Sequence, residues 1–165
     1  MTASTVTSGD PETRLAAGDH QPLRLWLRLF TCTTMIERQL SARLKREFGS
    51  TLPRFDLLAQ LQRAPTGLKM QELSARLLVT GGNVTWLVTS LVRDGHVTRT
   101  RAADDGRSAI VKLTPTGKRY FSRMARAHER WVAALLSGVP SREQRQLHLS
   151  LGNIKQQLRQ IQENQ

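Results

Sequence analysis

The sequence predicts a mainly α-helical protein with a small β-hairpin wing, in which a winged helix-turn-helix lobe is joined to terminal helices that form a homodimerisation domain. Three observations support this fold class. Apolar residues recur every three or four positions along most of the chain, as on the buried face of a helix. Over residues 96–114 the pattern changes to alternation on both sides of a turn-rich segment, which is typical of a β-hairpin. The first and last helices carry more apolar surface than one small domain can cover, which predicts a partner chain.

The composition indicates an anionic partner. Lys and Arg number 25 of the 165 residues against 13 Asp and Glu, which gives a net charge of +12, and 20 of the basic residues are Arg, whose guanidinium suits phosphate. The longest uncharged stretch, residues 77–92, is shorter than the roughly 20 apolar residues of a membrane span. Residues 1–10 do not form a signal peptide, and a single cysteine excludes an intramolecular disulfide framework. We therefore expect a cytoplasmic protein.

The first part of the chain is predicted to contain a disordered arm and two helices. Residues 1–19 hold almost no large apolar side chain that could offset the entropy of ordering, whereas residues 20–165 are predicted to form a single domain. Residues 23–48 show two apolar stripes on one helix, which therefore contacts two partners. Cys32 lies on the second stripe and is expected to be a small buried side chain. A short helix follows over residues 53–63.

Residues 70–95 are predicted to form two helices joined by a short turn. The first has about two turns, and Thr80 is the expected N-cap of the second, which ends at Gly95. The second helix has an apolar stripe at positions i, i+3, i+4 and i+7, formed by Val84, Leu87, Val88 and Leu91. Its outward positions form an uncharged, hydrogen-bonding face made of Gly82, Asn83, Thr85, Trp86, Thr89 and Ser90. Such a face suits the base edges of a DNA groove.

The rest of the chain is predicted to form the wing and two more helices. Two short strands over residues 96–101 and 108–114 flank a turn-rich tip. A long helix then runs from Pro115 to residues 137–138, and residues 141–144 match a capping box. The last helix has an apolar seam at spacings of 4, 3, 4 and 3, formed by Leu147, Leu151, Ile154, Leu158 and Ile161. This seam requires another helix.

Motifs of catalysis and metal binding are missing from the sequence. The four histidines are scattered, with no pair and no cysteine or carboxylate cluster at ligand spacing, so neither a metal nor a cofactor is expected. Gly81 and Gly82 open a helix without the Lys that a phosphate-binding loop requires. The sequence therefore predicts that the protein is not an enzyme.

The order of these elements, with Asp105-Gly106-Arg107 in the wing and Leu113-Thr114-Pro115-Thr116-Gly117 behind it, resembles the MarR family of bacterial transcription regulators over about residues 23–158. The resemblance implies a homodimer that represses transcription from an inverted-repeat operator in double-stranded DNA and is released by a small ligand. It also implies dimerisation helices over residues 20–50 and 138–165, a winged helix-turn-helix over residues 51–117 and a connecting helix over residues 115–137.

Two features depart from the pattern of the family, one in the recognition helix and one at the cap before the first helix of the pair. The family often has Arg after the Thr of the recognition helix and an acid three residues further on, whereas Trp86 follows Thr85 here and Thr89 stands at the later position. Lys69 replaces the usual Ser or Thr cap before the first helix of the pair. The operator sequence therefore cannot be transferred from relatives.

The DNA contacts can be assigned by side-chain chemistry. The side chains expected to contact bases are Asn83, Thr85 and Thr89. Trp86 either packs back onto the protein or contacts thymine methyls, and the sequence leaves both alternatives open. Arg107 is expected in the flanking minor groove, with Asp105 orienting its guanidinium. Residues 68–126 hold 11 basic and 4 acidic residues, so phosphate contacts are expected from Arg99, Arg101 and Lys118.

A narrower resemblance concerns the signal. Residues 23–28 and 52–58 are similar to a subgroup of MarR regulators that controls the catabolism of aromatic acids and responds to hydroxycinnamic acids or their coenzyme A thioesters. The family resemblance implies a pocket between the dimerisation helices and the DNA-binding lobe. The candidate residues offer aromatic walls and a cation for an acid, and they are Trp26, Phe30, Arg38, Arg54, Phe55, His128 and Trp131.

Two other functions compete with this interpretation. Cys32 could make the protein a thiol-based redox-sensing regulator. The same wing and charge could instead serve a nonspecific architectural nucleic-acid-binding protein that responds to no ligand.

Overall fold

The structure, a computed structural model, describes residues 20–77, 81–101 and 109–164. The predicted arm over residues 1–19, the Thr80 cap and the hairpin tip with Asp105 and Arg107 lie outside the described residues. The chain divides into two compact units, residues 1–125 and 126–165, each described by itself below. The predicted single domain and its division into dimerisation and DNA-binding parts stay predictions.

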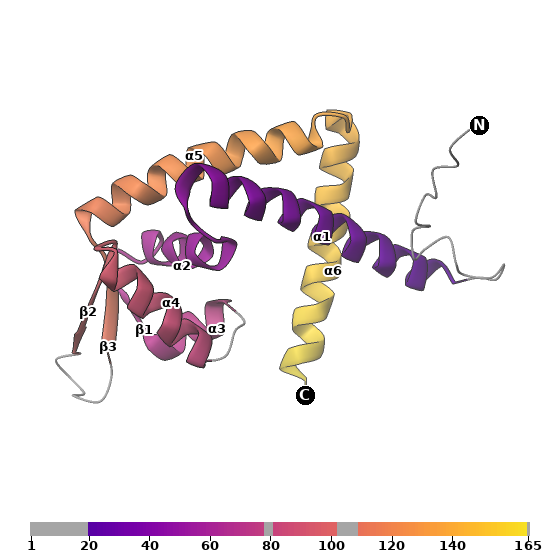
Figure 1. Cartoon of the computed structure of the whole chain (residues 1–165). Helices are drawn as coiled ribbons and strands as arrows, with labels where there is room; N and C mark the ends of the chain where they lie inside the picture. The colour runs from indigo at the N-terminus through magenta and orange to yellow at the C-terminus, as the bar shows by residue number, and fades with distance from the viewer. Residues whose placement is uncertain (1–19, 78–80, 102–108, 165) are drawn as a thin grey trace, which may run out of the picture. The chain divides into compact units, whose positions relative to one another are not determined.

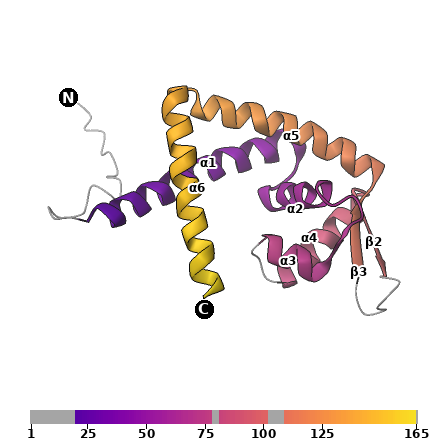
Figure 2. The ribbon, with the colours of Figure 1, turned by 180° about the vertical axis from the view of Figure 1, so that it is seen from behind.

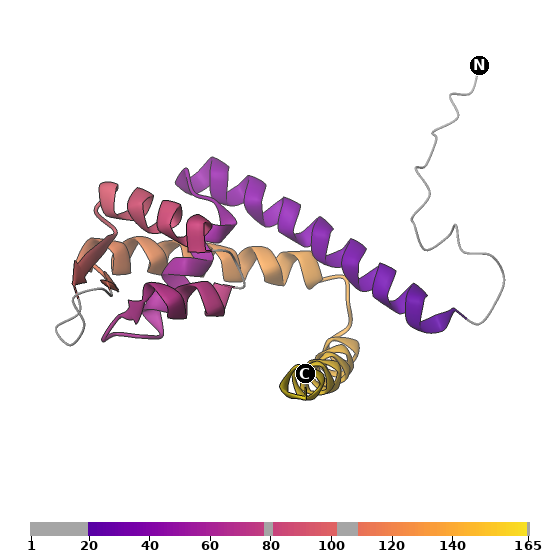
Figure 3. The same ribbon diagram turned by 90° about the horizontal axis from the view of Figure 1, so that it is seen from below.

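The described part of the first unit contains helices and a small sheet (Figure 1). Its elements are α1 (Gln21–Phe48), α2 (Leu52–Gln62), β1 (Leu68–Lys69), α3 (Met70–Leu77), α4 (Gly81–Arg93), β2 (Val97–Arg101), β3 (Ala109–Leu113) and the first part of α5 (Pro115–Leu136). Helix α1 is one unbroken helix (Figure 3), and α2, α3 and α4 pack against one another beside the strands (Figure 2). This arrangement confirms the predicted fold class, a mainly helical chain with a winged helix-turn-helix.

The sheet is antiparallel with the strand order β1-β3-β2. Val97 pairs with Leu113 and Arg101 with Ala109, so the predicted hairpin strands are confirmed, each within one or two residues of the expected ends. Strand β1 was not predicted, because two residues are too few to show an alternating pattern. Its Leu68 pairs with Val111 and is buried, which anchors the start of α3 on the wing.

The core of the first unit consists of apolar side chains that converge from every one of its helices. All four predicted inward residues of α4 are buried, and so are Phe55, Leu58 and Leu61, which helical spacing places on the inward side of α2. The fully buried side chains, each less than 2% exposed, are Leu44, Leu57, Leu58, Leu61, Leu73, Val84, Val88, Leu91, Val111, Met124 and Ser50. Helical periodicity therefore identified the buried face of the helix-turn-helix correctly.

Helix α5 begins against the backbone that follows α4. Thr114 Oγ1 donates a hydrogen bond to the Gly95 carbonyl at 2.8 Å and accepts one from the Gly117 amide at 2.9 Å. A Cβ on Gly117 would lie 1.9 Å from the His96 carbonyl oxygen, so only glycine allows this approach. The spacing of Thr114 and Gly117 therefore allows the start of α5 to pack against the backbone that follows α4.

The start of α3 is capped in a different way from the family pattern. The backbone amide of Lys69, just before the helix, donates to Glu72 Oε2 at 2.6 Å, which is one half of a capping box. The Lys69 side chain cannot supply the other half, because an ammonium group accepts no hydrogen bond from the helix amides.

The second unit contains the last part of α5 and α6 (Ser141–Glu163). The predicted capping box over residues 141–144 is wrong: Pro140 is the N-cap, and no side chain caps the helix. Because the helix starts one residue earlier than a box with Ser141 as N-cap requires, the Gln144 side-chain amide instead donates to the carbonyls of Leu136 and Val139, at 3.1 and 2.8 Å. The predicted apolar seam of α6 is present, but α6 has no buried residue within this chain.

Candidate nucleic-acid interface

The outward face of α4 is the candidate surface for DNA. Five of the six predicted positions are exposed, namely Gly82, Asn83, Thr85, Trp86 and Thr89. Trp86 has 66% of its surface exposed, so among the described residues it does not pack back into the protein. Thr85 Oγ1 donates to the Gly81 carbonyl at 3.0 Å, which leaves its methyl group and its lone pairs for a partner.

Ser90 was placed on this outward face, and that prediction is wrong. The side chain is only 7% exposed, and its hydroxyl donates to the Leu87 carbonyl at 2.9 Å. Arg54 of α2 covers it and donates from Nη1 to Ser90 Oγ at 3.2 Å. The helical pattern placed Ser90 outward because the arginine that covers it lies 36 residues away in the sequence.

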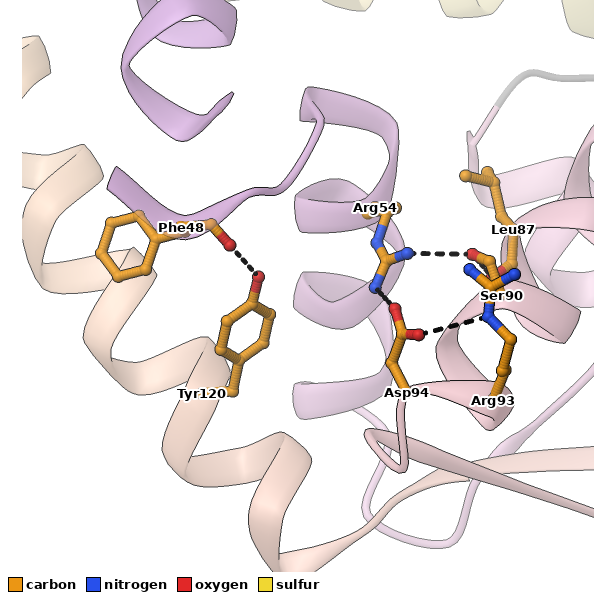
Figure 4. A network of polar contacts seen from close by, with 7 residues as sticks. All are labelled: Phe48, Arg54, Leu87, Ser90, Arg93, Asp94 and Tyr120. Carbon is orange, nitrogen blue, oxygen red and sulfur yellow. Dashed lines mark hydrogen bonds and ion pairs between the residues drawn. The ribbon is translucent and has the colours of Figure 1, made fainter. Parts of the chain in front are cut away.

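Arg54 fixes the C-terminal end of α4 (Figure 4). Its Nη2 donates to Asp94 Oδ2 at 2.5 Å, and Arg93 Nε lies 3.5 Å from the other carboxylate oxygen. The hydrogen bond from Arg54 holds the pKa of Asp94 below its usual value. The Arg54 side chain is 12% exposed and both of its terminal nitrogens are engaged. The guanidinium that was predicted to bind a ligand thus holds the recognition helix, and its role toward a ligand stays a prediction.

A stacked pair lies where α4 passes into β2, and sequence reasoning did not predict it. The ring of His96 stacks on Tyr120 with centroids 4.1 Å apart and an angle of 6° between the planes. Tyr120 Oη donates to the Phe48 carbonyl at 3.0 Å, which joins α5 to the end of α1 (Figure 4). Burial, with the positive charge of Arg54, lowers the pKa of His96. No sequence signal marked these residues, since the pair depends on contacts between distant helices.

The predicted phosphate contacts lie on the wing and on α5. Arg99 and Arg101 are exposed and share one side of β2, because side chains alternate along a strand. Lys118 is exposed in the first turn of α5. Arg107 and Asp105, assigned to the minor groove, lie outside the described residues.

The predicted ligand residues fall into both units, and they differ in exposure. Trp26 and Phe30 stack on each other on α1, with centroids 5.9 Å apart, and both are exposed. Phe55 is 8% exposed and packs against Phe121 in the core, so it does not offer a free wall to a ligand. The other predicted ligand residues are an exposed Arg38, a half-buried His128 whose pKa is lowered by burial, and a buried Trp131.

Cys32 was expected to be buried, and this prediction is wrong. Its thiol is on an exposed position of α1. The reason is that the second apolar stripe of this helix is only partly covered within the chain, where Leu25 also has 46% of its surface exposed.

Residues 20–77, 81–101 and 109–164 contain no group of three His, Cys, Asp or Glu side chains that could hold a metal ion. No helix in the same ranges is long and apolar enough to cross a membrane.

Known proteins share both the sequence and the fold. A family model described as "MarR family" matches residues 48–108. YkoM of Bacillus subtilis, an uncharacterised HTH-type transcriptional regulator, is 34% identical over 108 residues, which cover 65% of this chain and 69% of YkoM.

Two solved structures extend the similarity to nearly the whole fold. A MarR family transcriptional regulator from Silicibacter pomeroyi is 36% identical with a TM-score of 0.72, over 86% of this chain and 99% of that one. Sco3205, a MarR family transcriptional regulator from Streptomyces coelicolor crystallised in complex with DNA, is 26% identical with a TM-score of 0.75, over 87% of each chain. These relatives are transcriptional regulators rather than enzymes. The chain therefore belongs to the MarR family of transcriptional regulators.

Proposed function

We propose that the protein binds an inverted-repeat operator as a cytoplasmic homodimer, with α4 in the major groove and the wing beside it. The observation that carries this proposal is the uncharged, exposed face of α4, which Arg54 holds at its C-terminal end. Arg99, Arg101 and Lys118 are then the phosphate contacts, and Arg107 is the minor-groove contact. Two recognition helices related by a twofold axis require half-sites about one helical turn apart, roughly 34 to 36 Å.

The homodimer is proposed from apolar surface that the chain leaves uncovered. The seam of α6 has Leu147, Leu151, Leu158 and Ile161 between 43% and 56% exposed. Helix α1 exposes the side chains of Leu23, Leu25, Trp26, Phe30 and Met35. Burying a leucine contributes roughly 1.5 to 3 kcal/mol. A second copy that covers these positions therefore makes the dimer more stable than the separate monomers.

The signal is proposed to be an aromatic acid or its coenzyme A thioester, which releases a repressor from the operator of an aromatic-compound catabolic operon. The stacked, exposed pair of Trp26 and Phe30 offers a surface for a planar group, and Arg38 on the same helix offers a cation for a carboxylate or phosphate. Similarity of residues 23–28 and 52–58 to aromatic-acid regulators supports this class. A tenfold loss of operator affinity requires the ligand to favour the released geometry by about 1.4 kcal/mol.

A mobility-shift assay on the promoter beside the gene of this protein tests the proposal. We expect a retarded complex that Arg107→Ala weakens several-fold and that free hydroxycinnamates or their thioesters dissociate. The matched control is Arg159→Ala, which removes one positive charge from the last helix, outside the proposed interface. Equal affinity for all duplexes, with the same dependence on salt, would instead identify a nonspecific architectural protein.

The exposed position of Cys32 keeps the thiol sensor as a second candidate. Peroxide is therefore included in the same assay. Release by peroxide alone, abolished in Cys32→Ser, would contradict the ligand model and support oxidation of this thiol. Release that persists in Cys32→Ser excludes the thiol as the sensor.

A further inference from the structure

Trp86 occupies the middle of the outward line of α4. Gly82, Trp86, Thr89 and Arg93 follow one another at spacings of 4, 3 and 4, which places them on one side of the helix, and all four are exposed. Trp86 has 66% of its surface exposed, which is unusual for a large and mostly apolar side chain. An exposed tryptophan within a polar surface indicates a contact with a partner.

Two glycines leave the backbone of the first turn of α4, next to Trp86, without side chains. One turn before Trp86 stands Gly82, and a Cβ built on that glycine would meet no atom of the described residues within 4 Å. For Gly81, the first residue of the helix, such a Cβ would meet Ser74 Oγ at 4.0 Å and no other atom in the described part of the chain. The first turn of α4 can therefore approach the floor of a groove more closely than a helix with side chains there, and this approach brings the indole to the depth of the base edges.

The side chains around Trp86 suit A·T base pairs. Arg93, the last residue of this line, lies beside Asp94 at the C-terminal end of α4, and residues 81–92 contain no Arg or Lys, the side chains that most often bind guanine in the major groove. Asn83 offers an amide, which suits adenine, and Thr85 offers a methyl group because its hydroxyl proton is bonded to Gly81. From Gly82 to Thr89 the helix rises about 10 Å, which corresponds to roughly three base pairs.

We propose that Trp86 determines operator specificity by contacting the C5-methyl group of thymine in the centre of each half-site. The indole supplies apolar surface, and the methyl group is the one apolar feature that a base pair presents in the major groove. This inference rests on the proposed function, since it requires α4 to lie in the major groove of a specific site. Its chemistry is distinct from that of the family members with Arg at this position, whose guanidinium suits guanine.

The test uses the full chain and duplexes selected by it from a randomised library. Each thymine of the selected half-site is replaced in turn by deoxyuridine, which lacks only the C5-methyl group. At one or two positions per half-site we expect the wild-type protein to lose affinity about fourfold for each methyl contact. Trp86→Ala is expected to bind the thymine and deoxyuridine duplexes equally. Val92→Ala is the matched control, since it shortens another exposed apolar side chain of α4 off this line and should retain the full sensitivity.

A second set of duplexes replaces thymine by a different base, with or without the C5-methyl group. At the sensitive positions, cytosine and 5-methylcytosine are compared in place of thymine. The wild-type protein is expected to prefer 5-methylcytosine by a similar ratio, and Trp86→Ala is expected to lose this preference. Circular dichroism and the urea midpoint of Trp86→Ala establish that the variant is folded.

The outcomes separate this inference from the proposed function. If the library yields no preferred sequence, the proposed function fails. If a sequence is selected but deoxyuridine causes no loss, or if Trp86→Ala keeps the full loss, Trp86 does not read thymine methyls and the inference is overturned while the proposed function stands.

Discussion

Removing the Asp94 carboxylate is expected to destabilise the protein more than removing the arginine that binds it. In the Asp94→Ala variant the Arg54 guanidinium, 12% exposed, keeps its charge but loses its ionic partner. Hydrogen bonds to charged groups contribute about 1.5–3 kcal/mol, and a poorly hydrated donor adds its own cost, so we expect a loss of about 2 kcal/mol. Arg54→Met keeps the apolar stem and leaves Asp94, which is 33% exposed and can regain water. Its expected cost is about 1 kcal/mol.

The double variant isolates the interaction. If the pair is coupled as the geometry indicates, Asp94→Ala combined with Arg54→Met costs about as much as Arg54→Met alone, which corresponds to a coupling of about 2 kcal/mol. Urea unfolding followed by circular dichroism at one protein concentration measures all four proteins, because dimerisation would make the stability depend on concentration. Glu47→Ala is the control, since its contact with Arg46 is exposed and should contribute less than about 0.5 kcal/mol. Additive single effects, within about 0.5 kcal/mol, would refute the reasoning.

Three further predictions follow from other parts of the structure. Gly117→Ala is expected to cost more than about 3 kcal/mol in urea unfolding, because its Cβ would lie 1.9 Å from the His96 carbonyl, whereas Gly152→Ala on the open surface of α6 should be neutral or stabilising. The pKa of His96 is lower in the folded state than its ordinary 6.5, so the unfolded chain takes up the proton first and stability should fall as the pH drops below about 6.5. His96→Phe keeps a ring against Tyr120 and should make the free energy of unfolding depend less on pH between pH 7.5 and 5.5. If the variant shows the same pH dependence as the wild type, other titrating groups cause it. Leu151→Glu places a charge in the seam of α6 and should weaken the proposed dimer at least a hundredfold in sedimentation equilibrium, while a dimer of unchanged affinity places the interface elsewhere.

The regular elements could be predicted because each depends on a local pattern. In α4 the apolar spacing of Val84, Leu87, Val88 and Leu91 determines which side is buried, and the structure buries that side. The two hairpin strands were recognised because alternation and a turn-rich tip lie within 20 residues of each other. Boundaries differ from the predicted ones by one or two residues, since helix ends depend on caps rather than on periodicity.

The interactions between elements could not be predicted from one sequence. Ser90 has a polar side chain at an outward helical position, and only the covering Arg54, 36 residues away, explains why it is buried. Gln144 belongs to a segment that matches a capping box, yet the helix starts one residue earlier than the box requires because Pro140 takes the N-cap position. In each of these cases the sequence pattern was real, and a contact or a proline outside the pattern decided the outcome.

The recognition helix is fixed at one end and open at the other. At its C-terminal end Arg54 binds Asp94 and Ser90, and the carbonyls of Gly95 and His96 accept hydrogen bonds from Thr114. These contacts join α4 to α2 on one side and to the start of α5 on the other, whereas at the first turn a Cβ on Gly81 or Gly82 would meet, among the described residues, at most Ser74 Oγ at 4.0 Å. The C-terminal contacts thus add polar links to the packing of the buried side of α4. The part of the exposed face from Gly82 to Thr89 carries no charged side chain, and the helix that presents it is held by its buried apolar side and by these hydrogen bonds.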